Sequence, residues 1–92
     1  MHESSLMNGL LRQIESAARV NSATSVAAVE LYIGALAGIS AEHLREHFDS
    51  AKVGTLAEGA ELRIRVSDDP CSPHARDILL ESIEVGLPEG AS

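Results

Sequence analysis

The sequence predicts a two-layer α/β (α+β) sandwich, in which two helices cover one face of a three-stranded mixed sheet. Three observations lead to this fold. Apolar residues recur at helical spacing in two segments, and they alternate with polar residues in three others. The 92 residues suffice for a single domain with one core. The expected order of elements is α-β-α-β-β.

The first helix is predicted over residues 5–19. Its apolar residues share one face, namely Leu6, Leu10, Ile14 and Ala17. Ser4 or Ser5 is available as the N-cap, and the polar residues 21–25 end the helix. Gly9 costs about 1 kcal/mol relative to alanine inside a helix. We therefore expect a neighbouring element to approach the chain closely at Gly9.

Residues 28–33 alternate as in a strand, with Val29, Leu31 and Ile33 on one face. A turn over residues 34–39, with two glycines, leads to the second helix. Ser40 is placed to cap this helix, and Glu42 lies in its positively polarised first turn. The inner stripe of the second helix is formed by Leu44, Phe48 and Ala51.

Residues 60–66 give the clearest strand, because Ala60, Leu62, Ile64 and Val66 alternate with charged residues. A loop follows over residues 67–73, then a third strand over 78–85 and a frayed tail over 88–92. The helix between the first two strands suits a right-handed parallel crossover. The last two strands suit antiparallel pairing with each other.

Composition excludes several functional classes. Fourteen acidic residues against seven basic ones give a net charge of −7, which repels nucleic-acid backbones, and Trp is absent. No apolar run approaches the ~20 residues that span a bilayer, and the first residues do not resemble a signal peptide. We expect a cytoplasmic protein without nucleic-acid or membrane partners. The single cysteine, Cys71, cannot form an internal disulfide.

The chain opens with Met1, His2 and Glu3, which are candidate metal ligands. A histidine at position two lets the α-amine, the His2 amide nitrogen and the His2 imidazole close adjacent chelate rings. Amide nitrogens must lose a proton to bind, and Ni²⁺ and Cu²⁺ achieve this in tetragonal geometry. The spacing alone favours an ordinary solvated terminus, because short motif matches are often accidental.

Two further pairs could bind metal, but an inert role is favoured for each, because a two-ligand motif is a weak signal. His43 and His47 share one face of the second helix, which suits either half a metal site or two half-exposed histidines. Cys71 and His74 form Cys-x-x-His, which is half a zinc site or an ordinary loop. Neither a nucleophile elbow nor a phosphate-binding loop occurs. The sequence therefore predicts that the protein is not an enzyme.

Several ordered segments resemble the HypA/HybF family of nickel metallochaperones. The first is Met1-His2-Glu3 with Ser5-Leu6, and the second is Ile33-Gly34-x-Leu36-x-Gly38-Ile39. The others are Glu42-x-Leu44-Arg45-x-x-Phe48, Gly54-Thr55-x-Ala57-Glu58-Gly59-Ala60 and Leu79-x-Glu81-Ser82-Ile83-Glu84. The resemblance implies transient Ni²⁺ binding at Met1, His2 and Glu3. It also implies delivery of nickel to immature [NiFe]-hydrogenase, or to urease. The partners that it implies are a HypB-type GTPase and the immature hydrogenase large subunit.

The chain departs from this family in two places. The family's zinc-binding insertion, with two Cys-x-x-Cys pairs, is lacking between about residues 67 and 76, so residues 1–92 are expected to form a single nickel-binding domain without zinc. Ala35 stands where family members commonly have glutamate. The alternative function is therefore a hydrogenase assembly adaptor that keeps a docking surface on its first helix and does not deliver metal. We expect a monomer or a weak homodimer.

Overall fold

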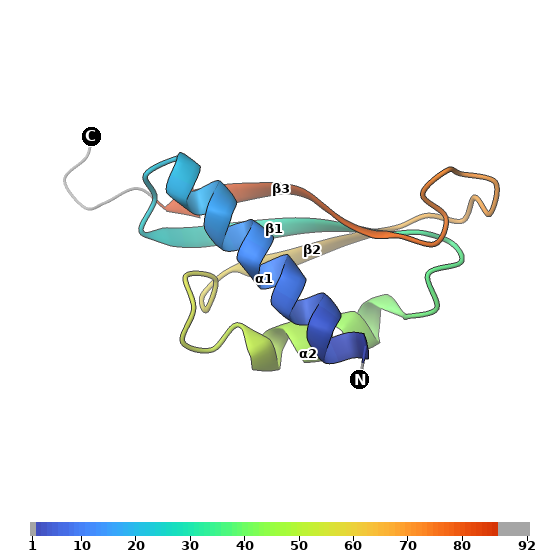
Figure 1. Ribbon diagram of the computed structural model, residues 1–92, viewed down its shortest axis with the longest axis horizontal. Coiled ribbons are helices and arrows are strands. Elements are labelled where there is room, and N and C mark those ends of the chain that lie inside the picture. Colours follow the sequence, from blue (N-terminus) through green and yellow to red (C-terminus); the bar gives the residue numbers. More distant parts are fainter. Residues whose placement is uncertain (1, 87–92) are drawn as a thin grey trace.

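The computed structural model describes the backbone of residues 2–86 and the side chains of residues 5–86. Its elements are α1 (His2–Val20), β1 (Ser25–Ile33), α2 (Ala41–Ala51), β2 (Glu61–Val66) and β3 (Ile78–Gly86). Figure 1 shows the three strands as one layer with the two helices lying across it. The predicted order and the α+β sandwich are therefore confirmed. The tail predicted over residues 88–92 lies outside the described residues.

The sheet has the order β2-β1-β3. β1 and β2 are parallel, from Ala28 opposite Glu61 to Ile33 opposite Val66, and α2 forms the crossover between them as predicted. β3 runs antiparallel to β1 instead of to β2. The prediction that the last two strands pair with each other is therefore wrong, because β1 lies between them.

β1 occupies the centre because both of its faces are apolar. Leu31 and Ile33 are buried beneath the helices, and Ala28 and Tyr32 are buried on the opposite face. On β2, by contrast, every second residue is charged and exposed, a pattern suited to a sheet edge. β1 also begins three residues before its predicted start, because a register shift against β3 interrupts the alternation there.

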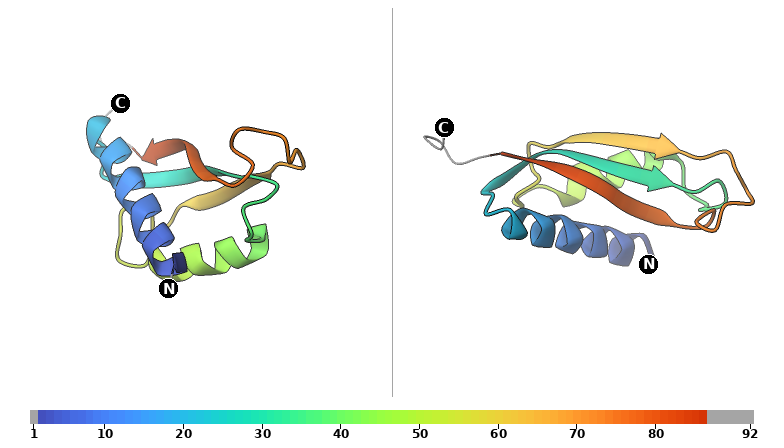
Figure 2. Two further views of the ribbon diagram at one scale, coloured as in Figure 1. Left: turned by 45° about the vertical axis from the view of Figure 1, so that its right-hand side comes forward. Right: turned by 90° about the horizontal axis from the view of Figure 1, so that it is seen from above.

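Both helices cover the same face of the sheet, as Figure 2 shows from two further directions. α1 packs on β1 and β3, whereas α2 packs on β2 and on α1. Half-buried residues of β3 pack against a single apolar cluster that joins the other four elements: Met7, Leu10, Ile14, Ala18, Val26, Val29, Leu31, Ile33, Leu44, Phe48, Ala57, Ala60 and Leu62. The opposite face of the sheet carries no helix among the described residues.

α1 begins at His2, three residues before its predicted start, so neither Ser4 nor Ser5 is its N-cap. No glycine or proline precedes the apolar stripe, and nothing in the sequence stops the helix from extending back. Its C-terminal end lies one residue beyond the prediction. There Ser22 adopts a left-handed φ of 55°, and the amides of Ser22 and Ala23 donate to Arg19 and Ala18 carbonyls.

Gly9 is not a site of close approach, contrary to the prediction. A Cβ atom built at this position would meet nothing within 4 Å. The glycine therefore weakens α1 without a packing reason in the described structure.

We expect Gly9→Ala to raise the free energy of unfolding by about 0.5–1 kcal/mol, because alanine restricts the unfolded chain and favours the helix. Urea denaturation would measure the gain, with a rise in Tm of several degrees for a domain of this size. Ser16→Ala, at an exposed position of the same helix, is the control and should gain less. An unchanged or lower stability of Gly9→Ala would contradict this prediction.

The loop over residues 67–77 crosses the end of β1 and contacts the turn that follows it. Gly34 donates its amide hydrogen to the Asp77 carbonyl at 2.9 Å, and Leu36 donates to the Ala75 carbonyl at 2.6 Å. A Cβ at Gly34 would lie 2.3 Å from the carbonyl oxygens of both His74 and Ala75. The glycine is thus required here by the close approach of two backbones.

Candidate metal centre

The predicted ligands Met1, His2 and Glu3 lie at the start of α1. Met1 and the side chains of His2 and Glu3 fall outside the described residues, whereas the helix backbone begins at His2. Figures 1 and 2 show that this first turn lies beside α2. The first turn of α1 is therefore next to a second helix, which itself carries candidate ligands.

α2 places His43 and His47 side by side at the margin of the core. Ser40 caps the helix as predicted, because its hydroxyl accepts the His43 amide hydrogen at 3.1 Å. Leu44 and Phe48 are fully buried, which fixes the rotation of α2. The two histidines each precede one of these anchors by one residue, so they lie together on the flank of the helix.

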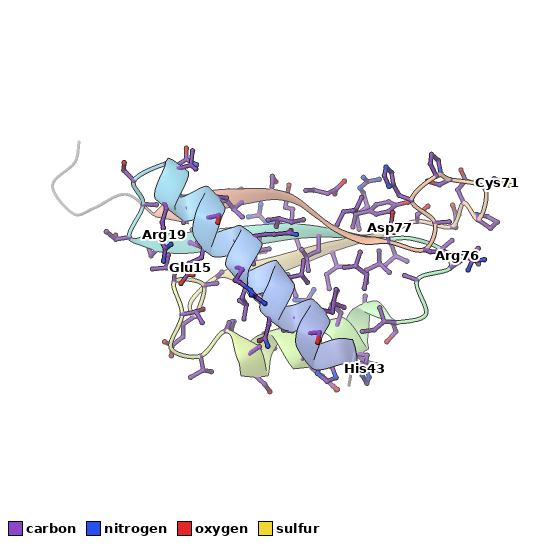
Figure 3. All side chains as sticks on the ribbon, in the orientation of Figure 1. Glu15, Arg19, His43, Cys71, Arg76 and Asp77 are labelled. Atoms are coloured by element: carbon purple, nitrogen blue, oxygen red, sulfur yellow. The ribbon has the colours of Figure 1, made fainter. Side chains whose placement is uncertain are left out.

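The two imidazoles approach each other through their Nε2 atoms, which are 2.9 Å apart. Their ring centroids are separated by 4.6 Å and the planes are tilted by 44°. His43 is exposed and His47 is half-buried, and each has a further interaction besides this pair. Figure 3 shows His43 beside the first turn of α1.

Cys71 and His74 lie in the loop between β2 and β3, and Figure 3 shows Cys71 well separated from His43. The Cys71 thiol is exposed, and its amide donates to Asp69 Oδ1 at 2.9 Å. His74 Nδ1 is 3.0 Å from Asp77 Oδ2. The structure does not bring this pair to His43 and His47. Within the described part of the chain, no three His, Cys, Asp or Glu residues gather as a metal site.

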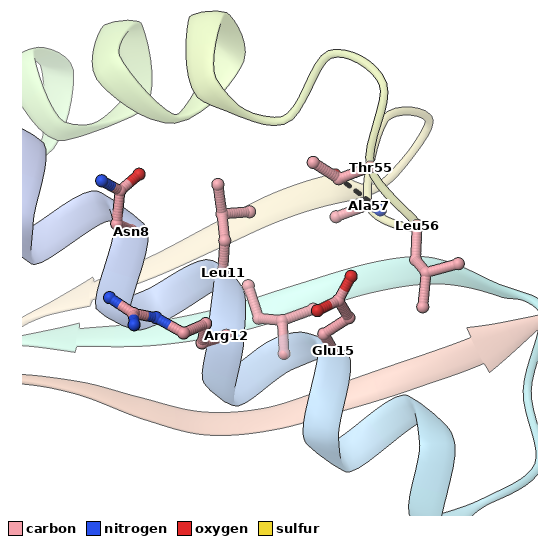
Figure 4. A pocket seen from close by; sticks show the side chains of 8 residues that line it. Asn8, Leu11, Arg12, Glu15, Thr55, Leu56 and Ala57 are labelled. Carbon is pink, nitrogen blue, oxygen red and sulfur yellow. Dashed lines mark hydrogen bonds between the residues drawn. The ribbon is translucent and has the colours of Figure 1, made fainter.

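A shallow groove of about 330 Å³ lies between α1 and the segment that follows α2 (Figure 4). Its described lining includes Arg12 and Glu15 from α1 and Thr55 from the facing segment. The Thr55 hydroxyl is engaged locally, donating to the Lys52 carbonyl and accepting the Ala57 amide hydrogen. These lining residues include no histidine or cysteine.

The helix-free face of the sheet carries an ion-pair network that the sequence did not predict. Arg63 on β2 contacts Glu30, Glu61 and Glu84, with its closest approach of 2.7 Å to Glu84 on β3. Hydrogen bonds to Glu61 and then Glu84 raise the pKa of Arg63 above its ordinary value. Arginines on one strand and glutamates on another predict only an exposed charged face. Which of these residues pair across β1 depends on the strand order, which the local pattern does not give.

Arg65 has a similar position on β2. Its guanidinium pairs with Glu81 on β3 and lies 5.0 Å from the centroid of the Tyr32 ring. The hydrogen bond to Glu81 raises the pKa of Arg65. Both arginines of β2 are thus paired with carboxylates. In residues 2–86, neither helix has the length and apolar character needed to cross a membrane.

A family model described as "Hydrogenase/urease nickel incorporation, metallochaperone, hypA" matches residues 1–72. Hydrogenase maturation factor HypA of Chlorobium limicola is 50% identical over 64 residues, which are 70% of this chain and 55% of that protein. The protein of the same name from Acidithiobacillus ferrooxidans is 48% identical over 64 residues, covering 70% and 57%. The chain thus spans somewhat more than half the length of these relatives.

Two solved structures share the fold. The solution structure of the nickel metallochaperone HypA from Helicobacter pylori superposes with a TM-score of 0.80 at 17% identity, covering 94% of this chain and 98% of that one. A second solution structure, of a HypA protein, has a TM-score of 0.75 at 19% identity and covers 96% and 98%. At these identities the structural match supports the architecture alone.

Proposed function

Because the chain belongs to the HypA family of hydrogenase/urease nickel incorporation metallochaperones, we propose that it is a maturation factor that binds Ni²⁺ through Met1, His2 and Glu3. In this proposal it assists the insertion of nickel into [NiFe]-hydrogenase. The observation that carries the proposal is that the family match begins at residue 1 and so includes these three residues.

The chemistry of the terminus supports nickel as the cargo. The α-amine, the His2 amide nitrogen and the His2 imidazole are three nitrogen donors, a set that suits Ni²⁺ better than Mg²⁺ or Ca²⁺. The Glu3 carboxylate adds an oxygen donor. Binding displaces protons from these nitrogens, so nickel affinity falls as the pH falls. A proton-coupled site of this kind suits transient binding and release to a client.

The partners in this proposal are a HypB-type GTPase and the immature hydrogenase large subunit, and the compartment is the cytoplasm. We propose that the domain works without zinc, since the loop between β2 and β3 offers one cysteine where a zinc module needs several ligands. A monomer or weak homodimer fits the charged residues along the edge strand β2, which oppose edge-to-edge pairing.

An assembly adaptor is the second candidate function. It is favoured by Ala35 in the turn after β1 and by the loop between β2 and β3, which holds one cysteine where the family's zinc insertion has two Cys-x-x-Cys pairs. Such an adaptor would keep a docking surface on α1 and would not deliver metal. The two candidates differ in whether His2 is needed for maturation of the client.

Nickel titration of the untagged chain, with a free amine at Met1, tests the first candidate. We expect the absorption band of square-planar Ni²⁺ to grow with added nickel and to be lost in His2→Ala. His74→Ala, which removes an exposed histidine from the loop between β2 and β3, is the control and should keep the band. Equal nickel binding by wild type and His2→Ala would contradict the N-terminal site. Full hydrogenase maturation by His2→Ala would favour the adaptor.

A further inference from the structure

The outer edge of β3 pairs with no other strand among the described residues. In the order β2-β1-β3, both β2 and β3 are edge strands, and β1 satisfies only one side of each. We propose that residues 78–84 of β3 bind an extended segment of a partner protein as a fourth, antiparallel strand. This segment carries apolar residues on one face and lysine or arginine on the other. The inference concerns protein recognition and is independent of nickel binding at the N-terminus.

The backbone of β3 presents hydrogen-bonding groups on its outer side. Ile78 lies opposite Ile33 of β1, and the Ile33 carbonyl accepts the Ser67 amide hydrogen on the β2 side of the sheet. Ile33 and Ile78 therefore exchange no hydrogen bonds. The alternation of an antiparallel ladder repeats this arrangement at Leu80 and, beyond the bulge, at Ile83. The N–H and C=O groups of these three residues of β3 thus point away from β1, where an added strand could bind them.

The opposite edge of the sheet is partly covered by α2. Arg45 Nη1 donates to the Leu62 carbonyl at 2.9 Å, and Lys52 Nζ donates to the Ala60 carbonyl, just before β2, at 3.4 Å. Basic side chains of this kind protect an edge against strand addition. β3 contains no proline, lysine or arginine, and the bulge at Glu81 is its one protective feature. The two edges are therefore not equivalent, and β3 is better suited to accept a strand.

Ion pairs hold the two acidic side chains of β3 over the helix-free face of the sheet. Glu84 lies opposite the small residue Ala28 and reaches across β1 to Arg63, with a closest approach of 2.7 Å. Glu81 pairs with Arg65 across β1 in the same way. Both carboxylates are therefore drawn inward, toward β2. The outer edge of β3 is left without a blocking charge, while one face beside it remains acidic.

The apolar residues of β3 are incompletely covered. None of the nine residues of β3 is fully buried, whereas most residues of β1 are. Ile78, Leu80 and Ile83 pack against the core from the helix side but stay half-buried. Figures 1 and 2 show α1 crossing the sheet diagonally, with its C-terminal end beside the end of β3 and its N-terminal end beside α2. An added strand with apolar side chains on the helix side would bury these three residues further.

Charge favours a different protein over a second copy of this chain as the partner. Two β3 strands paired with each other would place four carboxylates on one face, and neither strand would supply a cation. Two chains of net charge −7 also repel each other. Lysine or arginine on the added strand would instead meet Glu81 and Glu84 with opposite charge, because a carboxylate can accept hydrogen bonds from more than one donor. Backbone pairing would then give affinity, and the side chains specificity.

The test uses the ¹⁵N-labelled full chain and a capped peptide of alternating valine and lysine, about eight residues long. We expect saturable chemical-shift changes and slower hydrogen exchange at the amides of Ile78, Leu80 and Ile83. Opposite residues of an antiparallel pair share a face, so valines would lie opposite these three residues and direct their own amides to β3. N-methylation of the valine amides should lower affinity at least about tenfold. N-methylation of the lysine amides, which would point to solvent, is the matched control and should preserve binding.

Variants of the chain test the role of charge. Wild type should bind the valine–lysine peptide more tightly than a valine–glutamate peptide of the same length. Glu81→Gln/Glu84→Gln removes both carboxylates of β3 and should abolish this preference. Glu42→Gln/Glu46→Gln removes the same charge from exposed positions of α2, so this control should keep the preference of wild type.

Three results would contradict the inference. If the valine–lysine peptide leaves the β3 amides unchanged, this edge does not accept a strand. If wild type binds the lysine and glutamate peptides equally, the partner is not selected by charge. If exchange of the β3 amides slows with rising protein concentration in the absence of peptide, the occupant is a second copy. None of these results bears on the N-terminal nickel site, which the His2→Ala titration tests separately.

Discussion

Replacement of Phe48 by alanine is expected to lower the free energy of unfolding by about 3–5 kcal/mol. Phe48 is the largest of the fully buried side chains among the described residues, and it belongs to the cluster that joins both helices to the sheet. A small domain has only about 5–15 kcal/mol in total, so the variant should be close to unfolding. Urea denaturation followed by circular dichroism would measure the loss.

Two controls define the origin of this effect. Phe48→Leu keeps most of the apolar volume and should cost less than half as much as Phe48→Ala. Val53→Ala truncates a side chain that is 65% exposed, and its cost should be within about 0.5 kcal/mol of zero. A Phe48→Ala variant as stable as Val53→Ala would show that α2 does not depend on this anchor. The rotation assigned to His43 and His47 would then lose its basis.

Gly34→Ala should destabilise the domain by about 3 kcal/mol, at the upper end of the cost of overpacking. The added methyl group would lie 2.3 Å from the carbonyl oxygens of His74 and Ala75, so one backbone must move. That movement would disrupt the hydrogen bonds that Gly34 and Leu36 donate to the loop. Urea denaturation measures the loss, and hydrogen exchange of these two amides should accelerate.

Gly59→Ala is the matched control for Gly34. A Cβ at Gly59 meets nothing within 4 Å and its φ is not left-handed, so this variant should be nearly neutral. Similar stabilities for the two variants would contradict the close approach of the loop to Gly34. Gly34 belongs to the Ile33-Gly34 segment that resembles the family. The close approach of the loop explains why a glycine stands at this position, without any role in metal binding.

The elements of the fold could be predicted because each depends on local pattern. Helical spacing around Ile14, alternation around Leu62 and the capping hydroxyl of Ser40 are all visible in short windows of sequence. The pairing of β3 was predicted wrongly because it depends on which strand is apolar on both faces. Tyr32, buried on the helix-free face of β1, was the available signal for a central strand.

The candidate site could be predicted only in pieces. The terminal Met-His-Glu and the i,i+4 spacing of His43 and His47 are both local features, and each was found. Their relation depends on how α1 crosses α2, which is set by the shared core and not by either motif. For the same reason, the ion pair between Arg63 and Glu84 could not be predicted. The two residues are 21 positions apart and belong to strands that do not pair with each other.

The central position of β1 also determines when the domain can fold during synthesis. Partners of β1 on β2 are 33 positions away along the chain, but those on β3 are 45 to 61 positions away. As the ribosome makes the protein from its N-terminus, β1 can pair with β2 while its other edge stays open until the last strand emerges. That open edge can recruit strands of other nascent chains. Slow elongation between β2 and β3 would therefore favour aggregation.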